Sequence, residues 1–277
     1  MPSPSRPRGL RRRRSNPLRM KAEIVILGSG TSMGVPTLGC SCAVCTSSDA
    51  RNARSRPSIA VQWPSGTVVI DTGQDFRRQA LREGIQHIDA VLYTHAHADH
   101  ILGMDDLRPL SFRHPNGLPL YADDTTSAAL HRVFEYTLSP RAEYPTRARV
   151  DLRSLNGHES VRIAGLRFQR VPILHGDLTV GGYRFGSAAY LTDMNSIPEG
   201  SLLLLEGLDT LIIDALRWQH HPSHNNVEQA LEWIERIRPR RAFLTHIAHE
   251  LEHTQTEAAL PGHIRLAYDG LRIPIEI

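Results

Sequence analysis

Residues 94–100 read Thr-His-Ala-His-Ala-Asp-His and follow the apolar run Ile88-Asp-Ala-Val-Leu-Tyr93. The run predicts a buried strand, and the heptapeptide predicts the tight loop in which that strand ends. This loop carries four side chains of metal-ligand type, those of His95, His97, Asp99 and His100. Imidazole and carboxylate together suit zinc, manganese or iron and are too rich in nitrogen for calcium or magnesium. The alternative is a polar turn that happens to be rich in histidine. It would account for a single ligand-type residue, but four in one short loop favour a metal site.

Further ligand-type residues follow other apolar, strand-like runs. His175 ends Val-Pro-Ile-Leu-His, Asp193 ends Ala-Tyr-Leu-Thr-Asp, and His246 ends Ala-Phe-Leu-Thr-His. Asp71 follows Thr-Val-Val-Ile in the same way, upstream of the heptapeptide. A set of His and Asp residues at strand ends indicates one site at the edge of a sheet.

These motifs resemble the signature of the metallo-β-lactamase superfamily over residues 22–270. The resemblance implies an α/β fold, the four-layer αβ/βα sandwich, with two divalent metal ions (Zn or Mn) at one edge between the sheets. One metal would bind His95, His97 and His175, the other would bind Asp99, His100 and His246, and Asp193 would bridge them. Asp99 then serves catalysis as well as metal binding, and Asp71 braces a ligand by hydrogen bonding or caps the turn after its strand.

The only three cysteines lie together in Gly39-Cys-Ser-Cys-Ala-Val-Cys45. An odd number in one short loop excludes a fold-wide disulfide framework. The thiolates of Cys40, Cys42 and Cys45 can turn toward one zinc ion and leave it one ligand short, and His249 is the natural fourth ligand. The alternative is a redox pair, because C-x-x-C is common in redox motifs.

The opening Leu-Gly-Ser-Gly-Thr-Ser-Met-Gly-Val-Pro (27–36), the cysteine loop and His246-x-x-His249 resemble the PhnP-type phosphodiesterases of this superfamily. The resemblance implies one structural Zn in a Cys3His site. It also implies hydrolysis of a small cyclic or nucleotide-like phosphodiester through a metal-bridging hydroxide. Two related families are alternatives to this assignment. Ribonuclease Z, an RNA-processing hydrolase, lacks the cysteine loop, and pyrroloquinoline quinone biosynthesis protein B usually has an altered metal motif.

His224 lies just before a helix that is predicted to begin near Asn225 or Asn226. In the PhnP branch a histidine at this position assists the leaving group as a proton donor, which suits an imidazole near pH 7. An exposed loop histidine is the alternative, and His220 and His221 are interpreted in that way. Asp214 would fix an imidazole tautomer or hold Arg217, or serve only structure. Arg51, Arg54 and Arg56 would bind phosphate or lie solvated on the surface; the sequence does not separate these alternatives.

Hydrophobic periodicity places strands at 23–27, 58–63, 67–71, 90–93, 118–121, 167–174, 188–192, 210–214 and 242–245, and helices at 75–84, 124–136 and 226–237. Residues 136–160 lack periodicity and are predicted to form a flap near the cleft. The chain of 277 residues is long enough for one domain of this sandwich type. We therefore expect a single metallo-β-lactamase-fold hydrolase domain over residues 20–277.

Residues 1–19 hold seven arginines and no acid. The net charge of the whole chain is +3, so the remaining residues carry four more negative than positive charges. The terminus is expected to be a disordered basic extension, or to precede a true start at Met20; a nucleic-acid-binding arm is the alternative. The sequence contains no run of about 20 apolar residues, so no membrane span is predicted. We expect a cytoplasmic enzyme with a small phosphodiester substrate and no nucleic-acid partner, and the sequence leaves open whether it forms a homodimer.

Overall fold

Two seven-stranded β-sheets form the middle of the computed structural model, which describes residues 21–139 and 144–277. The first has the strand order β14-β1-β2-β3-β4-β5-β6 and the second β13-β12-β11-β10-β9-β8-β7. The strands of the first sheet are β1 (Lys21–Gly28), β2 (Ser58–Trp63), β3 (Gly66–Ile70), β4 (Ala90–Leu92), β5 (Leu118–Ala122), β6 (Val150–Ser154) and β14 (Arg272–Glu276). Those of the second are β7 (Ser160–Ile163), β8 (Leu166–His175), β9 (Leu178–Phe185), β10 (Ala188–Leu191), β11 (Thr210–Asp214), β12 (Arg241–Thr245) and β13 (Ile264–Leu266).

Each sheet is half antiparallel and half parallel. Strands β3 to β6 are parallel in the first sheet, and β10 to β13 are parallel in the second. Because parallel strands end at the same edge, the loops after β3, β4, β10, β11 and β12 gather at one side of the molecule. This edge is where the predicted metal ligands lie.

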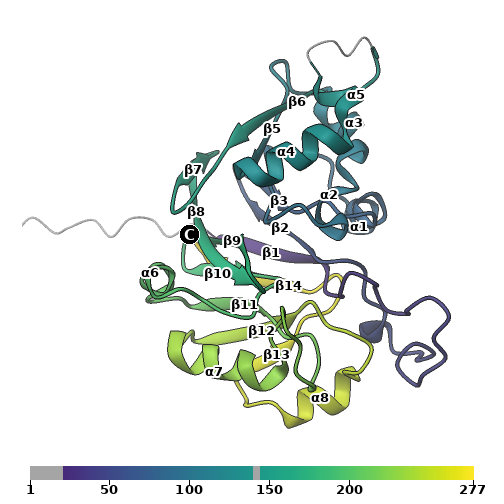
Figure 1. Ribbon diagram of the computed structural model, residues 1–277, viewed down its shortest axis with the longest axis vertical. Coiled ribbons are helices and arrows are strands. Elements are labelled where there is room, and N and C mark those ends of the chain that lie inside the picture. The colour runs from purple at the N-terminus through teal and green to yellow at the C-terminus, as the bar shows by residue number, and fades with distance from the viewer. Residues whose placement is uncertain (1–20, 140–143) are drawn as a thin grey trace, which may run out of the picture.

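Helices cover the outer face of both sheets (Figure 1). The helices α1 (Phe76–Arg82), α2 (Ala98–Ile101), α3 (Arg108–Ser111), α4 (Asp124–Val133) and α5 (Glu135–Leu138) belong to the first sheet's side. The helices α6 (Glu199–Leu202), α7 (Val227–Ile237) and α8 (His253–Ala259) belong to the second. Three short 3-10 helices cover Ala50–Asn52, Met104–Leu107 and Leu203–Leu205.

The core has one apolar cluster between the sheets and one under each helical layer. Along β1, Ile24 and Ile26 face the second sheet, while Val25 and Leu27 face α1 and its neighbours, as the two-residue period of a strand requires. On the other side, Val227 of α7 packs on the second sheet. These layers, helix on sheet on sheet on helix, confirm the predicted αβ/βα sandwich.

The strongly periodic elements are found close to their predicted ranges. Asn226 caps α7 in a capping box with Gln229, as the sequence predicted for Asn225 or Asn226. Helix α4 ends at Val133, three residues before the predicted end, because Phe134 leaves the helical region. Among the described residues, no helix is long and apolar enough to cross a membrane.

The predicted flap at 136–160 is wrong in part. It contains β6, which pairs in parallel with β5, and the chain then crosses to β7 at the edge of the second sheet. Both are edge strands with mostly half-buried or exposed side chains, so they carry no apolar signal. Residues 140–143 of this segment, and the predicted extension at 1–19, lie outside the described residues.

Candidate metal centre and active site

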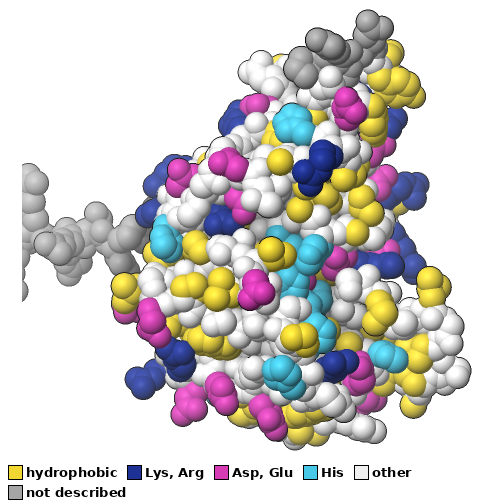
Figure 2. Space-filling model, viewed as in Figure 1, with side chains coloured by type: hydrophobic (Ala, Val, Ile, Leu, Met, Phe, Trp, Pro, Cys, Tyr) yellow, Lys and Arg dark blue, Asp and Glu magenta, His cyan; other side chains and the backbone are white. Residues whose placement is uncertain are grey.

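The predicted ligands meet at the edge where the parallel strands of both sheets end. The heptapeptide loop follows β4 of the first sheet, and His175 ends β8 of the second. Asp193 and His246 follow β10 and β12. Histidine side chains gather near the middle of the molecular face in Figure 2, between the two helical layers. Segments that are far apart in the sequence therefore supply one site.

Two clusters of ligand atoms share Asp193. One consists of His95, His97, His175 and Asp193, and the other of Asp99, His100, Asp193 and His246; within each, the atoms lie within 4.8 Å of one another. The Oδ2 atom of Asp193 lies 3.1 Å from Nε2 of His100, and its Oδ1 atom lies 3.2 Å from Nε2 of His246. The grouping is the one that the sequence predicted, while metal binding itself stays a prediction.

Several buried atoms of these clusters make no well-aligned hydrogen bond within the described residues, although two of them lie at ion-pair distance from Asp193. They are Nε2 of His95, Nε2 of His100, Nε2 of His246 and Oδ2 of Asp99. A buried polar atom without a partner costs about 1–3 kcal/mol, so native proteins rarely leave several of them together. Divalent cations would satisfy all four, and the residues therefore fit a pair of metal ions.

Hydrogen bonds outside the clusters fix the imidazole rings. The Nδ1 atom of His100 lies 2.7 Å from Oδ2 of Asp71, which also accepts a hydrogen bond from the Thr94 hydroxyl. The Nδ1 atom of His175 lies 2.8 Å from the carbonyl oxygen of Ser223. Nδ1–H donates in both cases, which leaves Nε2 free to face a metal. Asp71 thus braces the metal loop in the predicted way.

Three residues of the site adopt a left-handed backbone that L-residues other than glycine rarely adopt. These are Asp71 (φ 65°), Asp193 (φ 53°) and His246 (φ 60°), each just after a strand. Such a conformation costs about 1–3 kcal/mol. It turns the side chain out of the strand direction and into the site. Gly73 is needed nearby, because a side chain there would collide with the carbonyl oxygen of Asp99.

The carboxylates make the site strongly negative. Burial alone would lower the pKa of His246, but Asp193, Asp99 and Asp214 outweigh it and raise this pKa to about 9. His100 shows the same balance, with a pKa well above its usual value. In the absence of cations these two imidazoles hold protons that neutralise the carboxylates. A divalent cation would take over that role and release the protons.

His224 stands beside both clusters. Its Nδ1 atom lies 2.9 Å from Oδ2 of Asp214, so Nδ1–H donates to the carboxylate and Nε2 is left for another partner. Its ring centroid lies 4.6 Å from those of His175 and His246, and its side chain is 12% exposed. The position allows contact with a ligand in the site, and the proton-donor role stays a prediction.

His221 was interpreted as a loop residue, but its ring centroid lies 5.0 Å from that of His224. It therefore belongs to the rim of the site. The only signal in the sequence was the spacing of three residues to His224, on a loop between a strand and a helix.

The three cysteines converge on one imidazole. The Sγ atoms of Cys40, Cys42 and Cys45 lie 3.3, 3.4 and 3.6 Å from Nδ1 of His249. Ligand atoms of a tetrahedral zinc lie about 3.5 Å apart, given zinc–sulfur and zinc–nitrogen bonds of about 2.3 and 2.0 Å. Hydrogen bonds from the Cys45 backbone and from His249 lower the pKa of the Cys42 thiol to about 6, which favours the thiolate that zinc binds. The geometry fits the predicted Cys3His site.

The segments on either side of the cysteine loop are tied to the segment that carries His246. The backbone N–H of Ile247 donates to the carbonyl oxygen of Ser29, at 2.9 Å. The guanidinium of Arg54 is 1% exposed and donates to the carbonyl oxygens of Ala248 and Leu251. Arg54 is therefore neither a phosphate ligand nor a solvated surface residue, and both predicted roles were wrong for it.

Arg51 and Arg56, the other two arginines of that group, pair with Asp49 and Asp75.

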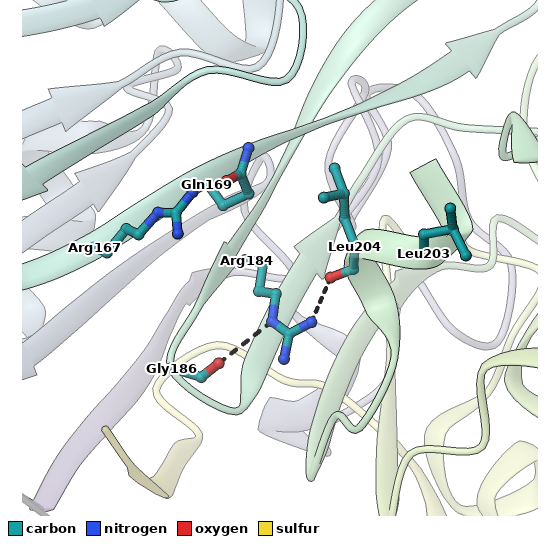
Figure 3. Close-up of a pocket in the computed structure, with 6 residues that line it drawn as sticks. All are labelled: Arg167, Gln169, Arg184, Gly186, Leu203 and Leu204. Carbon is teal, nitrogen blue, oxygen red and sulfur yellow. Dashed lines mark hydrogen bonds between the residues drawn. The ribbon is translucent and has the colours of Figure 1, made fainter. Parts of the chain in front are cut away.

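A pocket of about 440 Å³ lies away from these clusters, between the β8–β9 hairpin and the Leu203–Leu205 helix (Figure 3). Its lining is Arg167, Gln169, Arg184, Gly186, Leu203 and Leu204, without a histidine, cysteine or carboxylate. Arg184 donates to the carbonyl oxygens of Leu204 and Gly186, so its guanidinium is already used by the fold. This pocket offers none of the chemistry of the metal centre.

Comparison with known proteins agrees with this geometry. Residues 67–247, more than half of the chain, match the family model of the beta-lactamase superfamily domain. The crystal structure of a diphosphatase from the PhnP family is 48% identical in sequence, covers 94% of this chain and 99% of its own, and superposes with a TM-score of 0.88.

Two curated relatives match over part of their length. Octanoyltransferase of Porphyromonas gingivalis is 38% identical over 259 residues, which are 91% of this chain and 51% of that protein. Coenzyme PQQ synthesis protein B of Methylorubrum extorquens is 35% identical over 129 residues, 40% of this chain and 41% of that protein. The chain thus spans about half the length of the first relative.

The chain therefore belongs to the beta-lactamase superfamily and, within it, to the PhnP family. It has the metallo-β-lactamase fold, with residues that fit divalent metal ions at the edge where the parallel strands end.

Proposed function

We propose that the protein is a dinuclear metal-dependent phosphodiesterase acting on a small phosphodiester. The observation that carries this proposal is the carboxylate of Asp193, which belongs to two separate ligand clusters at once. Two divalent cations held in this way would supply a water nucleophile of lowered pKa and neutralise charge on the phosphoryl group. The first would be held by His95, His97 and His175, the second by Asp99, His100 and His246, with Asp193 between them.

His224 would complete the reaction by giving a proton to the leaving oxygen. Asp214 holds Nδ1–H of His224, so the opposite nitrogen, Nε2, is the one that faces a ligand. An alkoxide is a poor leaving group, and protonation by a positioned imidazole typically contributes 10²–10⁴-fold in rate, as an order of magnitude. The hydrogen bond to Asp214 supports this role because it fixes the tautomer and leaves Nε2 free to face the leaving oxygen.

A diphosphate diester is the second candidate substrate. The observation in its favour is the diphosphatase of the PhnP family that is 48% identical over nearly the whole chain. Each phosphorus of a disubstituted diphosphate bears one ionised oxygen, as in a phosphodiester. The same attack on phosphorus therefore applies, but the leaving group is a phosphate monoester, which depends less on a proton donor.

Three other functions have less support. An RNA-processing role would call for a basic surface, while residues 20–277 carry a net negative charge. A role in cofactor biosynthesis rests on a match to 40% of this chain. The octanoyltransferase relative matches over only 51% of its length, so its name gives little support for a transferase activity of this chain. The full set of metal ligands supports hydrolysis instead.

Metal-loaded protein should hydrolyse bis(p-nitrophenyl) phosphate, a 2′,3′-cyclic nucleotide or P1,P2-di(5′-adenosyl) diphosphate. Asp193→Ala should lower both the content of cleft metal and the rate, because the shared ligand is lost. Arg236→Gln on α7, which removes an exposed ion pair with Glu199 of α6, is the control and should change neither. Fully metallated protein that cleaves none of the three substrates would contradict the proposal.

A further inference from the structure

Arg217 is anchored between the two segments that flank the metal centre. The backbone N–H of Leu216 donates to the carbonyl oxygen of Asn225, the neighbour of His224, and the carbonyl oxygen of Leu216 accepts from Ala248, two residues after His246. Both hydrogen bonds are 2.9 Å long. The base of the Arg217 side chain is therefore fixed beside the rim of the site.

The guanidinium of Arg217 is held only loosely. Its Nη1 lies 3.4 Å from Oε1 of Glu250, and its Nη2 lies 3.4 Å from the carbonyl oxygen of His220, both at the long end for a hydrogen bond. Its Nε–H is buried and has no partner among the described residues. The side chains of Arg217 and Glu250 are 31% and 33% exposed. A cation with spare donors, accessible to solvent, can accept an anionic ligand.

The loop after Arg217 leads directly to the proposed proton donor. It contains His220 and His221, and the ring of His221 lies next to that of His224. Burial, then the charges of His224 and Arg217, hold the pKa of His221 below its usual value, which is consistent with a guanidinium close to this rim. Arg217, whose Nη2 lies 3.4 Å from the carbonyl oxygen of His220, thus belongs to the same loop as His224, beside which the leaving group would lie.

We propose that Arg217 provides a subsite for the second phosphate group of a diphosphate diester, at the rim where the rings of His221 and His224 lie. The inference rests on the proposed function and narrows its substrate class. Water adds to one phosphorus, and the bond from this phosphorus to the bridging oxygen breaks. The bridging oxygen leaves with the electron pair as part of the second phosphate, and the two protons of water pass to the product phosphates or to solvent. The charge that develops on the second phosphate lies beside Arg217, whose planar donors suit a phosphate.

The test compares one substrate that has a single anionic group with another that has two. Arg217→Gln should lower kcat/KM for P1,P2-di(5′-adenosyl) diphosphate by about 10- to 100-fold, the range for lost charge-assisted hydrogen bonds. Its kcat/KM for bis(p-nitrophenyl) phosphate should stay close to that of the unchanged protein. Arg217→Lys should recover part of the loss, because it restores the charge without the planar fork. Arg236→Gln is the matched control.

Binding gives a second readout that does not depend on turnover. The Kd of a non-hydrolysable methylene analogue of the same diphosphate, measured by calorimetry, should rise with Arg217→Gln by a similar factor at equal metal content. Equal losses for both substrates would show that Arg217 serves structure and would overturn the subsite. An unchanged protein that cleaves only bis(p-nitrophenyl) phosphate would overturn it too and leave the phosphodiesterase standing. Fully metallated protein that cleaves neither would overturn the proposed function itself.

Discussion

Asp71 and His100, 29 positions apart in the sequence, form a fully buried pair in which Oδ2 lies 2.7 Å from Nδ1. The pair links the end of β3 to the loop after β4 and sets which nitrogen of His100 faces the metal centre. Asp71 therefore positions His100 without being one of the predicted metal ligands.

Asp71→Asn keeps the shape of this side chain but removes its charge. The affinity for cleft metal should fall by about 10- to 100-fold, the usual effect of losing such a partner of a ligand. Titration with zinc or manganese, followed by metal analysis, measures the change. An unaltered affinity would mean that Asp71 only caps the turn after β3.

His224→Ala should keep the metals and lose about 10²-fold in rate with an alkyl leaving group. The loss should shrink with p-nitrophenolate, which needs little protonation. Steady-state kinetics over a series of phosphodiesters with leaving groups of different pKa measure this dependence. If good and poor leaving groups lose the same factor, His224 is not the acid.

Cys42→Ser tests whether the Cys3His site serves structure. We expect a lower melting temperature, because bound zinc contributes directly to the free energy of unfolding. Turnover per cleft metal should be largely retained in the protein that folds. Unchanged stability with abolished turnover at full cleft metallation would instead make the cysteine loop catalytic or redox-active.

Metal uptake should release protons. The pKa of His246 is raised to about 9, so in metal-free protein its imidazole is protonated at pH 7.5. The stability from this proton is fully present below the usual histidine pKa of about 6.5 and is lost as pH rises through about 9. Binding to the cleft should therefore release at least about one proton at pH 7.5, and less above pH 9. Calorimetry in buffers of different ionisation enthalpy measures this number, and no release at pH 7.5 would contradict the proton inventory of the site.

The sequence predicted which ligand-type side chains come together better than it predicted the outer strands of the sheets. Ligand side chains at the ends of apolar runs are visible without a structure, because both the strand and the ligand are local patterns. The strands β6, β7, β9, β13 and β14 were not predicted. Four of them lie at the edge of a sheet, where one-sided pairing requires little apolar sequence. The exception, β9, lies inside the second sheet, but Gly181 and Gly182 interrupt its apolar pattern.

Contacts between side chains and segments that are distant in the sequence could not be predicted either. Arg54 looked like one of three equivalent surface arginines, but backbone carbonyl groups nearly 200 positions away bury it. His221 looked like an ordinary loop residue, and only the ring contacts of His224 with His221 and His246 show that it lies at the rim. Such roles arise from tertiary structure and leave no periodic signal.

The metal ligands are divided between the two halves of the sandwich: the heptapeptide loop comes from the first sheet, and His175, Asp193 and His246 come from the second. Neither half alone supplies the full set of ligands for either predicted metal ion. Bound cations would act as cross-links between the halves, and each would favour their docked arrangement over any separated one. The ribosome must also deliver the chain beyond Asp193 before the first cluster can close and beyond His246 before the second can, so metal capture would come late in synthesis, after both halves have met.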